Sequence, residues 1–126
     1  MKYRAVKTYL VGKPEAVEDY PFGPEAAVFK VKNKMFAILG RYQDRDIVNL
    51  KCDPNEALML RDIFDDVIPG YHMSKTHWNT IFIEGDVPTK EIKRMIDRSY
   101  TLIVKSLKKT QRTALELAHG EEVLYQ

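Results

Sequence analysis

The chain of 126 residues is 44% hydrophobic and 10% aromatic, enough for one compact domain whose core needs neither disulfides nor metals. A lone cysteine, Cys52, excludes an internal disulfide, and the first residues, Met1 to Lys7, lack the apolar run of a signal peptide. No apolar stretch approaches the roughly 20 residues that a membrane-spanning helix needs. We therefore expect a cytoplasmic protein with no membrane partner.

The formal net charge of +2 conceals blocks of bases and acids that alternate along the sequence. Residues 1–13 carry bases and no acid, residues 53–66 are mainly acidic, and residues 90–112 are again mainly basic. Folding could gather the bases on one face that binds an anionic partner, or the blocks could pair with one another. Both outcomes are compatible with a total charge this close to zero.

The N-terminal part of the chain is predicted to form a helix and then a loop. Helical spacing of apolar residues over 2–12 indicates a first helix, which Gly12 and Pro14 end. The next segment, residues 15–25, is rich in turn residues and has no periodicity, so we expect an ordered loop held to the core by Phe22.

A β-hairpin is predicted next. Residues 28–32 and 35–39 alternate in hydrophobicity around Asn33-Lys34, which is the spacing of a hairpin with a two-residue turn. Pairing outward from that turn sets Val31 opposite Phe36 and Phe29 opposite Ile38.

The rest of the chain alternates between strands and helices. Asp53-Pro54-Asn55-Glu56 is a strong helix start, because it combines an N-cap, an early proline and an acid three residues after the cap. The remaining predicted elements are a strand at 46–52, a helix at 54–65, a strand at 78–84, a long helix from Pro88 and a short helix at 110–118. The predicted fold class is therefore α+β, with an antiparallel four-stranded sheet flanked by helices in the order α-β-β-β-α-β-α-α. Residues 1–119 form a single domain, and residues 120–126 form an acidic tail.

Several short segments carry a family resemblance. They are Tyr20-Pro21-Phe22-Gly23, Lys34-Met35-Phe36-Ala37, Leu50-Lys51, Pro69-Gly70-Tyr71-His72, Lys75, His77-Trp78-Asn79-Thr80, Ile96-Asp97 and Ser99-Tyr100. In this order they resemble the MmcQ/YjbR family of small bacterial proteins, with departures at Ser74, where Asn is common, and at Asn33, where Gly is common. The resemblance implies an antiparallel sheet flanked by helices in a double-wing arrangement. It also implies DNA binding, which has been proposed for the family from that fold.

The residues themselves offer a candidate surface for DNA. Lysines on a protruding hairpin could follow the phosphates of double-stranded DNA, and the loop before Trp78 and the exposed side of the long helix add further cations. Lysine also protects exposed strand edges, so a structural role for these residues stays open. The candidate DNA-binding residues are Lys30, Lys32, Lys34, Lys51, Lys75, His77, Arg94 and Arg98.

The alternative function is binding of a small molecule or peptide in a pocket between the sheet and the loop from His72 to Trp78. Its candidate residues are Tyr71, His72, His77, Trp78 and Tyr100. By strand alternation Trp78 shares a face with Thr80 and Phe82, which favours burial of the indole over stacking on a base.

Catalysis and metal binding receive weaker support. The nearby sequence does not give His72 and His77 the three or four ligands of a zinc site. Neither Ser74 nor Cys52 lies in a nucleophile elbow or beside an oxyanion-hole motif. We predict no catalytic residue, no metal and no cofactor, and the sequence favours binding over catalysis.

Overall fold

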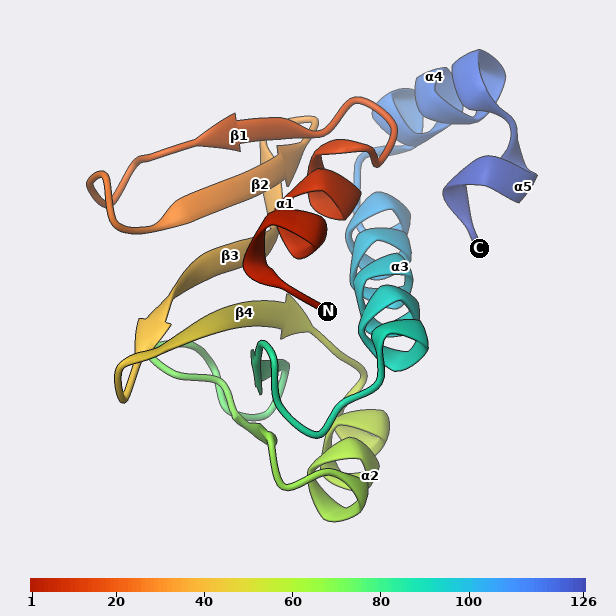
Figure 1. Ribbon diagram of the computed structural model, residues 1–126. Helices are drawn as coiled ribbons and strands as arrows, with labels where there is room; N and C mark the ends of the chain where they lie inside the picture. Colours follow the sequence, from red (N-terminus) through yellow and green to blue (C-terminus); the bar gives the residue numbers. More distant parts are fainter.

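The computed structural model describes residues 1–126. It consists of one sheet with helices packed against it (Figure 1). The elements are α1 (Tyr3–Val11), β1 (Val17–Asp19), β2 (Ala27–Val31), β3 (Lys34–Tyr42), β4 (Arg45–Lys51), α2 (Pro54–Ile63), β5 (Val67–Pro69), β6 (Trp78–Phe82), α3 (Thr89–Lys105), α4 (Lys109–His119) and α5 (Glu121–Leu124). The strands form a single sheet in the order β1-β2-β3-β4-β6-β5, and all neighbours are antiparallel. None of the helices is long and apolar enough to cross a membrane.

The antiparallel sheet flanked by helices is confirmed, but the prediction of four strands is wrong because the sheet has six. The missed strands are β1 and β5, which have three residues each and form the two edges. Three residues are too few for a period-two pattern to stand out. Strand β1 lies inside the segment expected to be a loop, and its pairing with β2 holds that segment in place. Phe22 does not anchor it, since this residue is 69% exposed.

The predicted β-hairpin is present, but its turn lies one residue earlier than expected. Lys32 and Asn33 both have positive φ, 48° and 66°, as the favoured two-residue hairpin turn requires. A bulge at Phe36 then shifts the register. The observed pairs are Ala27 with Leu39, Val28 with Ile38, Phe29 with Ala37, Lys30 with Met35 and Val31 with Lys34. Both predicted pairs are therefore wrong, because the turn lies one residue earlier than predicted and the bulge restores only part of that shift.

Ser99 of α3 satisfies the backbone beside this bulge. Its buried hydroxyl donates to the carbonyl of Phe36 at 2.6 Å and accepts from the backbone N–H of Lys51 at 2.9 Å. Buried backbone groups need such partners, since an unpaired one costs about as much as a lost hydrogen bond. One side chain thus joins the long helix to both β3 and β4.

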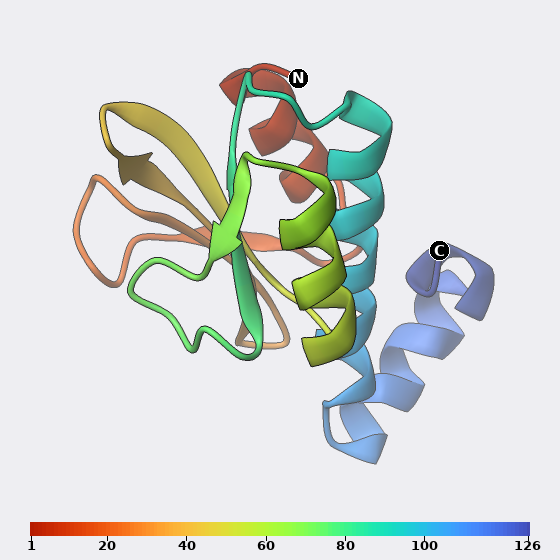
Figure 2. The ribbon, with the colours of Figure 1, turned by 90° about the horizontal axis from the view of Figure 1, so that it is seen from below.

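The core lies between the sheet and the helices. Figure 2 shows α2 and α3 side by side on one face of the sheet, while the loops lie on the other. Val6 and Leu10 of α1, the inner side of α3, and Leu115 of α4 belong to one cluster of 24 buried residues. Removal of this apolar surface from water is the main favourable contribution to folding.

The C-terminal residues are not a loose acidic tail. After Gly120, which has a φ of 84°, the chain forms the short helix α5. Leu124 is fully buried in the main core, and the Tyr125 hydroxyl donates to Glu116 of α4 at 2.8 Å. The prediction missed this segment because one short run, Val123-Leu124-Tyr125, is too short to show helical periodicity.

The predicted N-cap of α2 is confirmed. The carboxylate of Asp53 accepts from the backbone N–H groups of Asn55 at 3.1 Å and Glu56 at 3.2 Å. We expect Asp53→Ala to lower the free energy of unfolding by about 1 kcal/mol, measured by urea denaturation, because these N–H groups lose their acceptor. Asp53→Asn keeps an acceptor and should retain most of the stability. Equal losses in both variants would contradict a capping role.

Candidate functional site

The hairpin lysines predicted to bind DNA are mostly paired with acids. Lys30 lies 2.9 Å from Asp19, and Lys32 lies 3.1 Å from Glu15. Glu15 also contacts the ring of His119 on α4 at 2.8 Å. Hydrogen bonds from His119 and Lys32 lower the pKa of Glu15, so it is ionised at neutral pH. The positive charges of Lys30 and Lys32 on the hairpin are therefore neutralised within the fold.

The predicted arginines of α3 are also paired with acids. Arg94 and Arg98 both contact Glu56 of α2, at 3.5 Å and 2.7 Å, and Arg94 also contacts Glu91 at 3.0 Å. These pairs link the two helices on the side of the sheet opposite the loops. The arginines are consequently separated from Lys30 and engaged with acids.

The remaining predicted DNA contacts do not form one group either. The ammonium of Lys75 donates to the carbonyl of Gly70 at 3.0 Å, which closes its own loop. His77 is exposed, and its carbonyl accepts from the N–H of Cys52 at 2.8 Å. Lys51 is half-buried at the end of β4 and makes no ion pair.

The residues of the alternative pocket lie on two sides of the sheet. Tyr71 stacks on Tyr42 with ring centroids 4.0 Å apart, and His72 lies against Tyr71 at the same separation. Trp78 is 7% exposed, so it is buried as strand alternation predicted. Tyr100 instead belongs to the core between the sheet and α3.

The environment of Tyr100 confirms this separation. Its ring packs edge-on against Phe36 at 5.2 Å, and its hydroxyl donates to the carbonyl of Pro14 at 2.7 Å. The predicted pocket residues therefore do not converge, because one of them faces the helices while the others accompany the loop after β5.

The structure adds no support for Cys52 as a nucleophile or for a metal site. Burial, with a smaller contribution from Glu56 and Asp53, raises the pKa of the Cys52 thiol to about 11. The thiol is protonated at neutral pH and is a poor nucleophile. No three side chains of His, Cys, Asp or Glu are grouped so that they could hold a metal ion.

A different set of cations gathers where the hairpin tip meets the turn between α3 and α4. The ammonium of Lys34 donates to the hydroxyl of Ser106 at 2.8 Å, so the tip touches the end of α3. Further cations lie within six residues of Ser106 in the sequence, and we name them together with Lys34 the basic corner. It consists of Lys34, Lys105, Lys108, Lys109 and Arg112.

None of the cations in the basic corner forms an ion pair with an acid. Lys105 lies over the ring of Tyr125 at 5.3 Å, so its nearest recorded partner is an aromatic ring and not an acid. Helix α4 begins here without an acid in its first turn, and the partial positive charge of its N-terminus adds to the field. Only Lys34 was among the predicted residues. The other four could have been found from the density of bases between Lys105 and Arg112 in the sequence.

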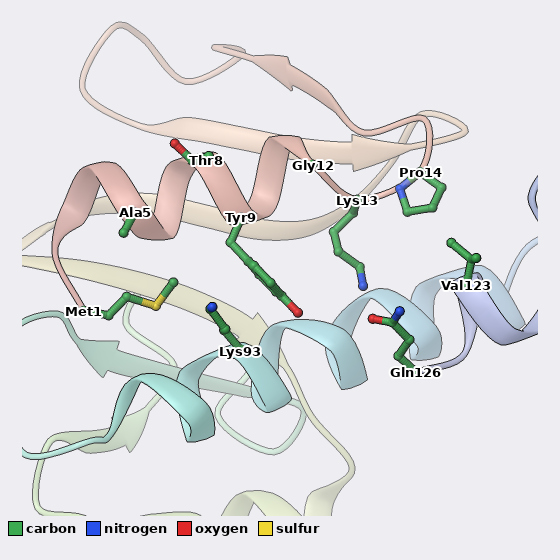
Figure 3. A pocket seen from close by; sticks show the side chains of 10 residues that line it. All are labelled: Met1, Ala5, Thr8, Tyr9, Gly12, Lys13, Pro14, Lys93, Val123 and Gln126. Carbon is green, nitrogen blue, oxygen red and sulfur yellow. The ribbon is translucent and has the colours of Figure 1, made fainter.

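A cavity with a volume of about 510 Å³ lies between α1, α3 and the C-terminal residues (Figure 3). Figure 3 shows that Tyr9 and Lys13 reach it from the α1 side and Lys93 from α3, while Val123 borders it from α5. The sequence pattern did not identify this cavity, because its walls come from the two ends of the chain.

Beside the cavity, Lys13 and Asp97 form a buried ion pair. Lys13 is only 7% exposed, and its ammonium lies 2.8 Å from one oxygen of Asp97. The hydroxyl of Tyr9 donates to both oxygens of Asp97, at 2.8 Å and 3.0 Å. Burial and the hydrogen bond to Asp97 raise the pKa of Tyr9 to about 12, so the phenol keeps its proton. The ammonium of Lys13 also lies 5.0 Å from the ring centre of Tyr100.

Comparison with known proteins agrees with the resemblance found in the sequence. The family model described as YjbR matches residues 11–102. The uncharacterized protein YjbR of Escherichia coli K12 is 33% identical over 107 residues, covering 85% of this chain and 91% of the relative. The uncharacterized protein YbdF of Escherichia coli O157:H7 is 34% identical over 90 residues, covering 71% of this chain and 74% of the relative.

A solved structure supports the same assignment. The crystal structure of a Deinococcus radiodurans protein with a DUF419 domain has a TM-score of 0.83 and 32% sequence identity, covering 90% of this chain and 87% of that one. The match to the family model includes Lys13, Asp97 and Tyr100 as well as the hairpin. The chain therefore belongs to the YjbR family.

Proposed function

We propose that the protein binds double-stranded DNA weakly and mainly through phosphates, with the basic corner as the contact surface. The observation that carries the proposal is the group of cations at the hairpin tip and the α3–α4 turn, where no acid forms an ion pair with any of them. Cations that are already paired must lose a partner before they bind a phosphate, whereas these need not.

The geometry of the corner favours contact with a phosphate backbone over reading of bases. Lys34 stands at the hairpin tip, and Lys108 and Lys109 stand at the start of a helix whose backbone N–H groups also favour anions. Lysine is a flexible point charge that neutralises phosphate without distinguishing sequence. We therefore expect similar affinities for unrelated duplexes.

Salt dependence provides the first test. Each phosphate that a protein neutralises contributes about −0.9 to the slope of log affinity against log salt, so engagement of most of the corner gives a slope of about −4. Fluorescence anisotropy with two short duplexes of unrelated sequence, between about 50 and about 200 mM salt, measures both affinity and slope. Absence of duplex binding at low salt would overturn the proposal.

A pair of matched variants locates the surface. Lys108→Gln with Lys109→Gln should weaken duplex binding about tenfold at low salt and reduce the slope by about 2, because two phosphate contacts disappear. The control is Lys2→Gln with Lys90→Gln, which removes the same charge from exposed positions at the starts of α1 and α3. Equal weakening in both variants would show attraction to net charge and would rule out the basic corner as the site.

A further inference from the structure

The cavity between α1 and α3 is an open groove with room for a small molecule, since Ala5, Lys93 and Val123 line it and are exposed. Its volume of about 510 Å³ falls within the range of about 300 to 1,000 Å³ that is common for ligand pockets. It lies near Tyr9 and Lys93, whereas Lys34 of the basic corner contacts the opposite end of α3 at Ser106. A ligand here would thus occupy a surface distinct from the proposed DNA contact.

The charged groups around the cavity favour an anion. Asp97 is the acid in contact with its wall, and it already accepts hydrogen bonds from Tyr9 and Lys13. The ammonium of Lys13 has three N–H donors but contacts one protein acceptor, an oxygen of Asp97. Lys93 adds a second cation that forms no ion pair and lies 5.4 Å from the ring centre of Tyr9. The cations around the cavity therefore outnumber the acid beside it.

The other walls are suited to an apolar group. Met1, Ala5 and Val123 line the cavity together with the ring of Tyr9. Burial of hydrocarbon against these side chains gains free energy in proportion to the area removed from water. The cavity thus combines an apolar wall with ammonium groups on either side of the Tyr9 ring.

We propose that this cavity binds an organic anion that has a single oxyanion head group on an apolar body, such as a medium-chain carboxylate. The head group would contact Lys93, and the body would lie toward Ala5 and Val123. The excess of cations favours a negatively charged head group. A cationic ligand would be repelled, and a neutral one would leave the ammonium groups without a new acceptor.

Fluorescence of anilinonaphthalene sulfonate, an aromatic sulfonate, tests the proposal. We expect saturable binding at one site, displacement by octanoate, and much weaker displacement by octanol or octylammonium. Lys93→Met should weaken the probe about fivefold, because it removes one partly exposed ion pair with the head group. Ala5→Trp should weaken it at least about tenfold by filling the apolar part of the cavity.

The controls separate this site from the rest of the surface. Lys90→Met removes an exposed cation on the first turn of α3, outside the cavity lining, and should leave binding unchanged. The Lys108→Gln/Lys109→Gln variant should also bind the probe normally, so loss of DNA binding and loss of this site are distinguishable. Equal displacement by octanol, or unchanged binding in both Lys93→Met and Ala5→Trp, would overturn the proposal.

Discussion

Asp97→Ala is expected to lower the free energy of unfolding by about 3 to 5 kcal/mol. The side chains of Lys13 and Asp97 are only 6% and 16% exposed. Removal of the carboxylate leaves a buried ammonium without its counter-charge, and the hydroxyl of Tyr9 loses its acceptor. Urea denaturation followed by the fluorescence of the buried Trp78 measures the loss.

Two comparisons isolate the cause of that loss. Asp62→Ala removes an exposed carboxylate of α2 that has no ion pair, and it should change stability by less than about 0.5 kcal/mol. Addition of Lys13→Met to Asp97→Ala should recover much of the stability, because no charge then remains buried. A double variant no more stable than Asp97→Ala would show that lost packing, not the uncompensated charge, dominates.

Ser99→Ala is expected to cost about 2 to 3 kcal/mol, because it leaves a buried backbone acceptor and a buried backbone donor without partners. These are the carbonyl of Phe36 and the N–H of Lys51. Amide hydrogen exchange should show the loss locally. In Ser99→Ala, the N–H of Lys51 should exchange faster than the N–H groups of other central strand residues.

Ser74→Ala is the matched control for this substitution. Ser74 lies exposed in the loop after β5 and forms no side-chain hydrogen bond within the protein, so its loss should be nearly neutral. A cost for Ser99→Ala as small as that for Ser74→Ala would mean that the strands at the bulge adjust and do not depend on the hydroxyl.

Local features could be predicted from the sequence because their causes lie within a few residues. The cap at Asp53 and the existence of the hairpin depend on neighbouring side chains and turn residues. The bulge at Phe36 could not be predicted, since the carbonyl at the bulge finds its hydrogen-bond donor in a serine that is 63 residues away. The edge strands β1 and β5 exist because longer neighbours offer them partners, and that information is absent from their own three residues.

The same distinction holds for the candidate sites. Charge density alone points to Lys105 through Arg112, but their meeting with Lys34 depends on how the hairpin packs on the end of α3. The pairing of predicted lysines such as Lys30 with acids of other elements likewise becomes visible only in three dimensions. The cavity beside Lys13 is the extreme case, since residues from both ends of the chain form it.

The pairing of Lys13 with Asp97 also has a consequence for the order of events during synthesis. The two residues are 84 positions apart, and the contact of Tyr100 with Pro14 spans 86. At about 5 to 20 residues per second, a ribosome makes α1 roughly 4 to 17 s before its partners on α3. During that interval Tyr9 and Lys13 lack the carboxylate of Asp97 as a partner. Docking of α1 can therefore be completed only after α3 has been made.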